Sequence, residues 1–102
     1  MNPSMPTYRW NKSEKEPLPP LVRVQWRDAV AWSTWTSLED AIRMQPDEVE
    51  TVARLLAWDE TSIHLASTVS ESSQDGYFEA TNCFAIPNVW VSSVVYMKVD
   101  DV

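Results

Sequence analysis

Residues 21–46 read LVRVQWRDAVAWSTWTSLEDAIRMQP, and this stretch decides the fold expected for the chain. It opens with strict alternation of side-chain type. The even-numbered positions are apolar: Val22, Val24 and Trp26. The odd-numbered positions between them are polar: Arg23, Gln25 and Arg27. A period of two is typical of a strand with one buried face. The pattern therefore predicts a strand over residues 21–27, with its arginines facing solvent.

The second half of the stretch has the signals of a short helix. Ser37 can cap the free N–H groups of a helix start, and Glu39 and Asp40 suit the positive end of the helix dipole. Pro46 cannot continue a helix, so we expect the helix to end near Gln45 after about two turns. Its apolar residues, Leu38, Ala41 and Ile42, fall on one face, which we expect to pack on the core.

The remaining chain alternates short apolar strands with polar turns. We expect strands over residues 49–58, 61–69, 77–86 and 94–99, a hairpin tip at Asp59-Glu60, a polar loop over residues 70–76 and a break at Pro87-Asn88. Five short strands with one helix after the first predict a mainly β (α+β) fold. The pattern is typical of a small antiparallel barrel or a strongly curved sheet, and the architecture we expect is the five-stranded small barrel.

We expect two parts in the chain: an extended N-terminal arm over residues 1–20 and a small β-barrel domain over residues 21–102. The arm holds five of the seven prolines, which fix φ and remove hydrogen-bond donors. Its centre, Tyr8-Arg9-Trp10, is aromatic and is not typical of a simple linker. The arm either packs on its own domain or reaches a neighbouring subunit or a ligand.

Composition excludes several classes of protein. Eight basic and 15 acidic residues give a net charge of −7, which argues against non-specific nucleic-acid binding. One glycine leaves no glycine-rich phosphate loop. One cysteine cannot form an internal disulfide, and no apolar run approaches the roughly 18 residues of a membrane span. We therefore expect a cytoplasmic protein with no membrane partner.

No arrangement of residues typical of catalysis or metal binding is evident. His64 and Cys83 are the single histidine and the single cysteine, and both fall within expected strands. Zinc needs several histidine, cysteine or carboxylate ligands that converge, and a catalytic pair needs an orienting acid. We expect neither an enzyme nor a resident metal or cofactor. The acidic residues are expected to be solvated charges, with a DNA-mimicking surface as the alternative.

Tryptophan and arginine give the sharper signal. Six tryptophans occur, and several lie outside the expected strands. Aromatic rings stack on nucleobases, and guanidinium groups hold phosphates bidentately. The candidate nucleotide-binding residues are Tyr8, Arg9, Trp10, Arg23, Arg27, Trp32 and Trp35. The alternative is that the tryptophans fill a core and a subunit interface, where tryptophan and arginine are also enriched.

The spaced pattern also resembles a group of small bacteriophage and prophage proteins. The shared features are a strand ending in W-x-D-A, a following aromatic residue, a short helix, a strand with V-x-x-V, a hairpin and an I-P break before the last strand. The matching positions are Trp26, Asp28, Ala29, Trp35, Val49, Val52, Leu55, Asp59, Leu65, Ile86 and Pro87, within residues 21–99. The resemblance implies an Sm-like small barrel and an anti-defence role in an infected bacterium.

The residues and the resemblance together favour a phage-type, non-enzymatic protein that sequesters a small cyclic nucleotide signal and forms a homo-oligomer. We expect assembly through strand edges and the N-terminal arm. An acidic protein–protein inhibitor or DNA mimic acting on a host defence protein remains the alternative, and a small hydrolase or nuclease is a third.

Overall fold

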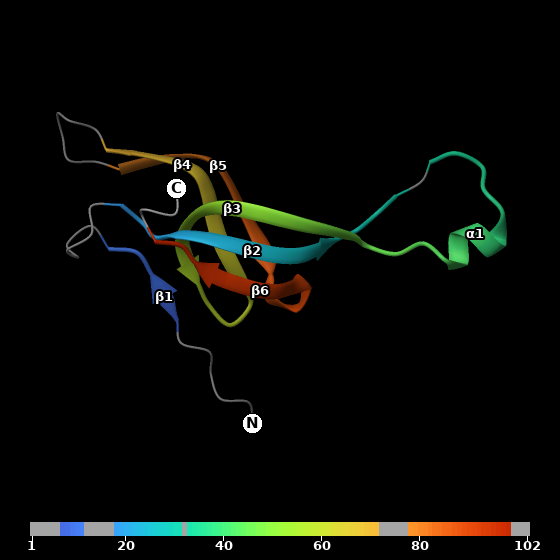
Figure 1. Ribbon diagram of the computed structural model, residues 1–102. Helices are drawn as coiled ribbons and strands as arrows, with labels where there is room; N and C mark the ends of the chain where they lie inside the picture. The colour runs from blue at the N-terminus through green and yellow to red at the C-terminus, as the bar shows by residue number, and fades with distance from the viewer. Residues whose placement is uncertain (1–6, 12–17, 32, 72–77, 99–102) are drawn as a thin grey trace, which may run out of the picture.

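The computed structural model describes residues 7–11, 18–31, 33–71 and 78–98 (Figure 1). Within them, antiparallel strands form one six-stranded sheet. The strands are β1 (Tyr8–Arg9), β2 (Leu21–Asp28), β3 (Asp47–Trp58), β4 (Ser62–Glu71), β5 (Phe78–Pro87) and β6 (Val91–Tyr96). A short helix, α1 (Leu38–Ile42), lies between β2 and β3, and a 3₁₀ turn, η1 (Asn88–Trp90), lies between β5 and β6. The mainly β class and the single α-helix after the first long strand are as predicted.

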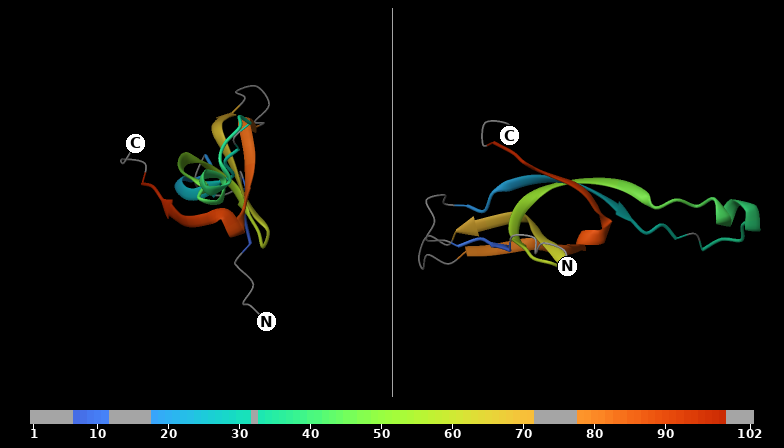
Figure 2. Two further views of the ribbon diagram at one scale, coloured as in Figure 1. Left: turned by 90° about the vertical axis from the view of Figure 1, so that its right-hand side faces the viewer. Right: turned by 90° about the horizontal axis from the view of Figure 1, so that it is seen from below.

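The sheet is open, so the prediction of a closed five-stranded barrel is wrong. The strand order is β5-β4-β3-β2-β6, with β1 added to β3, and no pairing joins β5 to β6 in the part of the chain that the structure describes. The three residues of η1 take the chain from one edge strand directly to the opposite edge. Register shifts occur at Leu55–Ala57 in β3 and at Gln25–Trp26 in β2. Such bulges increase twist and curvature, and Figure 2 shows a strongly curved but unclosed sheet.

The alternation predicted for the first strand is confirmed. Val22 and Val24 are fully buried, while Arg23, Gln25 and Arg27 are exposed. The buried cluster comprises Val22, Val24, Ala53, Leu55, Ile63, Leu65 and Ile86. Trp26 and Trp58 are half-buried beside this cluster, and each donates its indole N–H to a nearby side chain. The core is therefore built by side chains of β2, β3, β4 and β5.

Part of the N-terminal arm belongs to the sheet. Tyr8 pairs with Trp58 and Arg9 with Ala57, and the Trp10 N–H donates to the carbonyl of Leu56 at 2.9 Å. Residues 8–10 therefore pack on their own chain, which was the first of the two alternatives for the arm. Residues 1–6 and 12–17 lie outside the described residues, as do residues 72–77, where most of the polar loop was expected.

Residues 29–46 form a projection that we call the finger. It continues outward from the β2–β3 ladder, whose last pair is Asp28 and Asp47, and it carries α1 at its end (Figures 1 and 2). The predicted cap is confirmed, because Ser37 Oγ accepts the N–H of Asp40 at 3.1 Å. The helix ends at Ile42 with Arg43 as its C-cap, which is earlier than predicted.

The prediction that the apolar face of the helix packs on the core is wrong. No residue of α1 is buried, and Leu38 and Ile42 are 82% and 80% exposed. Helical spacing places these side chains on one face, but it does not place any other element against that face. The long β2–β3 ladder holds the helix away from the sheet, so the face has no partner within the described residues.

Candidate functional site

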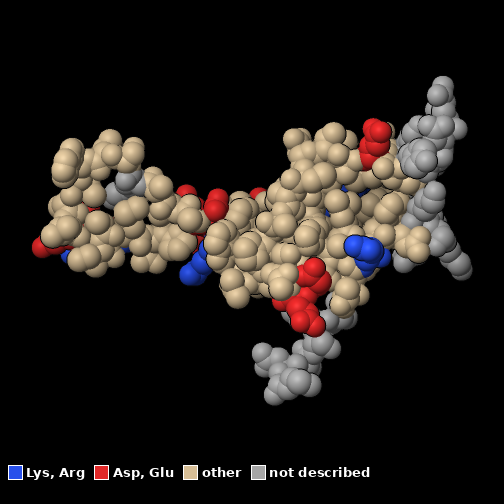
Figure 3. Space-filling view, turned by 180° about the vertical axis from the view of Figure 1, so that it is seen from behind, with Lys and Arg blue, Asp and Glu red and all other residues tan. Residues whose placement is uncertain are grey.

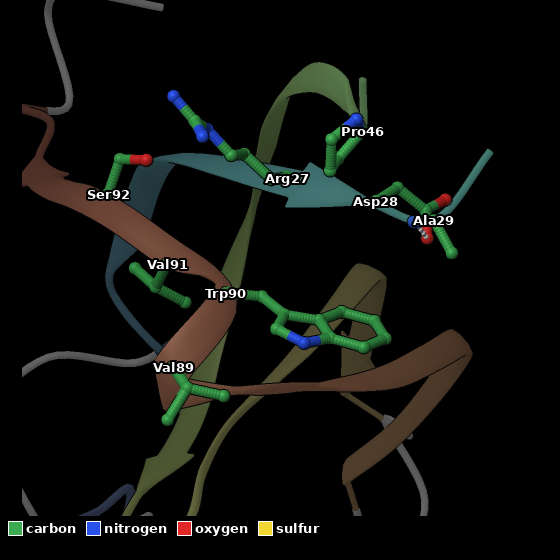
Figure 4. Close-up of a pocket in the computed structure, with 8 residues that line it drawn as sticks. All are labelled: Arg27, Asp28, Ala29, Pro46, Val89, Trp90, Val91 and Ser92. Carbon is green, nitrogen blue, oxygen red and sulfur yellow. Dashed lines mark hydrogen bonds between the residues drawn. The ribbon is translucent and has the colours of Figure 1, made fainter. Parts of the chain in front are cut away.

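A pocket lies where the finger leaves the sheet. It has a volume of about 490 Å³ and is bounded by two segments that are distant in sequence. One wall comes from the finger base and the other from η1 and the start of β6. The lining residues are Arg27, Asp28, Ala29, Pro46, Val89, Trp90, Val91 and Ser92 (Figure 4). Ligand pockets span about 300–1,000 Å³ and combine apolar walls with a few polar groups, so both size and lining are suitable.

Trp90 supplies the aromatic wall of the pocket. In Figure 4 its indole extends from η1 toward Asp28 and Ala29, and 43% of the residue is exposed. Asn88 fixes the turn that carries it. The amide of Asn88 donates to the Asp59 carbonyl at 2.8 Å and accepts the Trp58 indole N–H at 3.0 Å. Trp90 is therefore presented by a turn that is hydrogen-bonded to the β3–β4 connection.

Arg27 supplies the cationic side of the pocket. The strand alternation directs it outward, and in Figure 4 its side chain extends over β2 toward Ser92. Its Nε lies 3.3 Å from Glu48 Oε1. Because the two side chains are 59% and 75% exposed, this ion pair is weak, in the range of about 0–1 kcal/mol. The terminal amino groups of a guanidinium remain suitable for holding an anion bidentately.

The other predicted nucleotide-binding residues lie in separate places. Arg23 shares the exposed face of β2 with Arg27, but it pairs with Glu50 at 3.6 Å and does not line the pocket. Tyr8, Arg9 and Trp10 lie along β3, and the Trp10 ring meets Phe78 edge-on at 4.8 Å. Trp35 is at the finger end, and Trp32 lies outside the described residues. Of the six candidates that the structure describes, Arg27 alone lines the pocket.

Sequence reasoning missed Trp90 as a site residue. The signal was available, because Trp90 follows the Pro87-Asn88 break and lies outside an expected strand. The sequence does not predict that Trp90 shares a pocket with Arg27, because the two residues are 63 positions apart. They come together through the pairing of β2 with β6.

A Ser–His–Asp grouping occurs at the β3–β4 turn. Ser62 Oγ lies 3.0 Å from His64 Nε2, and Asp59 Oδ2 lies 3.7 Å from the same nitrogen. In a catalytic triad the acid orients the imidazole through Nδ1 and leaves Nε2 for the serine. Here both groups contact Nε2, so the triad geometry is not present.

Asp59 instead closes the turn. Its Oδ1 accepts the N–H groups of Thr61 and Ser62 at 2.8 and 3.0 Å and the Thr61 hydroxyl at 2.9 Å. These hydrogen bonds, led by the one from the Thr61 N–H, lower the pKa of Asp59 from 3.8 to about 2. The predicted hairpin tip at Asp59 is thereby confirmed, and its carboxylate has a structural role.

On the face seen in Figure 3 the acidic residues form several small groups and no continuous stripe. Among the described residues, no group of three or more histidine, cysteine or carboxylate side chains could hold a metal ion. No helix within these residues is long and apolar enough to cross a membrane.

Comparison with protein families, with curated proteins and with solved structures gives no match for this chain. The class of protein is therefore defined by the fold itself: a small, open, antiparallel sheet with a projecting finger and one pocket described at its base.

Proposed function

We propose that the protein is a non-enzymatic binding protein that captures a small nucleotide in the pocket at the base of the finger. The observation that carries the proposal is the shared lining of that pocket by the Trp90 indole and the Arg27 side chain. A nucleobase would stack on Trp90, and a phosphate group would lie against Arg27 and Ser92. Base stacking on an aromatic ring contributes about 1–3 kcal/mol.

Asp28 supports a base that carries an exocyclic amino group. One of its oxygens, Oδ1, accepts the Ala29 N–H at 2.8 Å, and the other oxygen has no hydrogen bond among the described residues. Carboxylates accept hydrogen bonds from base amino groups. The same carboxylate repels phosphate, so we propose that the base lies on the Asp28 side of the pocket and the phosphate on the Ser92 side.

The resemblance to phage and prophage proteins supports a more specific proposal. On that basis the ligand is a cyclic nucleotide defence signal, the sheet is related to Sm-like small barrels, and the protein acts as a homo-oligomer in the cytoplasm of an infected bacterium. An acidic inhibitor of a host protein is the second class, and it has less support because Glu50 and Glu48 are paired with Arg23 and Arg27.

The test is a fluorescence and calorimetric titration of the protein with cyclic di- and trinucleotides. We expect Trp90→Ala and Arg27→Ala each to weaken binding about 5- to 150-fold, the equivalent of a stacking or charge-assisted contact. Arg23→Ala is the matched control, because Arg23 lies on the same strand face with a similar ion pair but outside the pocket. We expect its affinity to equal that of the wild type.

Two results would contradict the proposal. One is the absence of any fluorescence change, heat or thermal shift with every nucleotide tried. The other is binding that survives both Trp90→Ala and Arg27→Ala. Recovery of chemically altered nucleotide after denaturation would instead indicate an enzyme.

A further inference from the structure

The two charged residues that line the pocket lie on opposite faces of β2. Asp28 is half-buried and shares the strand face of Trp26, whereas Arg27 points to the other face and is exposed. The pairing of β2 with β6 ends at Trp26 and Val91, so this edge of β2 has no strand partner at Arg27 and Asp28 among the described residues. A ligand that lies across this edge contacts a carboxylate on one side and a guanidinium on the other.

The Asp28 carboxylate is held in a fixed position with acceptor capacity left over. Its Oδ1 accepts the Ala29 N–H at 2.8 Å (Figure 4), and its second oxygen has no hydrogen bond among the described residues. Each carboxylate oxygen has two lone pairs, so both oxygens can still accept from a ligand. Asp47 lies directly across the ladder and adds a second negative charge. This end of the pocket therefore favours two adjacent hydrogen-bond donors and disfavours acceptors.

The common nucleobases differ in this property. Guanine presents two adjacent donors on its Watson–Crick edge, the N1–H and the N2 amino group, and a carboxylate can accept both in parallel. Adenine and cytosine each place an acceptor ring nitrogen beside their single amino group, and uracil and thymine place a carbonyl on each side of their single N–H. Against a carboxylate these acceptors are repelled, so guanine is the base that fits Asp28.

We infer that the pocket selects guanine nucleotides, and that Asp28 accepts the N1–H and the N2 amino group of the base while the ring stacks on Trp90. The phosphate then lies on the Arg27 side of the strand edge. The inference rests on the proposed function, because it names the base of the ligand captured in the same pocket. A site that hydrogen-bonds a ligand discriminates strongly against analogues that lack the bonding groups.

The first test compares ligands that differ in the base alone, by calorimetric titration of the wild type at one salt concentration. The probes are guanosine, inosine and adenosine monophosphates, together with cyclic di-GMP and cyclic di-AMP. We expect guanine ligands to bind at least about tenfold more tightly than adenine ligands, the equivalent of one bidentate contact. Inosine keeps the N1–H and lacks the N2 amino group, so its affinity should fall between the two.

The second test changes the carboxylate. Asp28→Asn keeps the shape of the side chain but presents one acceptor and one donor, which matches adenine, so the ratio of guanine to adenine affinity should reverse. Asp47→Asn is the matched control, because it removes the same charge from the opposing ladder position and does not line the pocket. It should keep the guanine preference of the wild type. Far-UV circular dichroism checks that both variants fold.

Equal affinity of the wild type for guanine and adenine ligands overturns the inference and leaves the proposed capture of a nucleotide in place. A guanine preference that Asp28→Asn leaves unchanged, or that Asp47→Asn abolishes equally, also overturns it. Absence of binding by every probe overturns both the inference and the proposed function. The inosine comparison uses the wild type alone, so it decides the question even if Asp28→Asn does not fold.

Discussion

Trp10 differs from the other described core-edge tryptophans in its hydrogen bonding. Its indole Nε1 is buried without a hydrogen-bond partner among the described residues, whereas Trp58 donates to Asn88 and Trp26 donates to Thr51. An unsatisfied buried donor costs about 1–3 kcal/mol, while a satisfied one stabilises. The ring of Trp10 nevertheless contributes through its edge contact with Phe78, which joins the arm to the start of β5.

We therefore expect Trp10→Phe to leave the free energy of unfolding within about 1 kcal/mol of the wild type, because it keeps the ring contact and removes the orphaned N–H. Trp10→Ala should cost about 2 kcal/mol or more. Trp58→Phe is the matched control and should cost about 1 kcal/mol through the lost bond to Asn88. Chemical denaturation measures all three. A larger loss in Trp10→Phe than in Trp58→Phe would refute this account.

Asp59 makes stability depend on pH in the acid range. Its folded-state pKa of about 2 is below the ordinary value of 3.8. The ionised carboxylate therefore stabilises the fold fully above pH 3.8, and this stabilisation is lost as the pH falls toward 2. We expect Asp59→Ala to melt below the wild type at neutral pH and the difference to shrink between these two values.

Thermal melts of both proteins across this window provide the measurement, and the carboxyl carbon chemical shift of Asp59 reports its titration directly. A difference in melting temperature that stays constant down to pH 2 would show that the ionised state contributes nothing.

At the scale of elements, the finger is separable from the sheet. Its helix buries no side chain, its cap is a local hydrogen bond, and the core cluster draws on β2, β3, β4 and β5 without it. Asp28 and Asp47 are already opposed at the end of a paired ladder. A two-residue type I′ turn can join such positions, and Asn-Gly is its preferred sequence.

Replacement of residues 29–46 by Asn-Gly should therefore leave a folded sheet. We expect the free energy of unfolding to change by about 1 kcal/mol or less, because no core contact is removed. Chemical denaturation of the variant and the wild type measures this difference. Failure of this variant to fold would mean that the finger stabilises β2 and β3, in conflict with its exposure.

At the scale of the whole molecule, the open sheet ends at two long outer strands, β5 and β6, each with one paired neighbour among the described residues. Phe84, Val95 and Tyr96 are exposed on them. Such edges can pair with other chains, and strand-edge assembly was the arrangement expected from sequence.

The sequence by itself determined the local structure of this protein. Strict alternation placed Val22 and Val24 inside and Arg23 and Arg27 outside, because side chains of a strand point to opposite faces in turn. Ser37 marked the helix start and Asp59 the turn, because each accepts hydrogen bonds from N–H groups within three residues. These features depend on residues that are close in the sequence, so they can be predicted without the tertiary structure.

Only the tertiary structure decided which of these elements contact one another. The apolar face of Leu38 and Ile42 reads as a core face by its spacing, yet the length of the β2–β3 ladder holds it in solvent. Whether the sheet closes into a barrel depends on the bulges in β2 and β3 and on the position of β6 after η1. Arg27 and Trp90 line one pocket because β6 pairs with β2. Such meetings follow from long-range strand register, which no local pattern encodes.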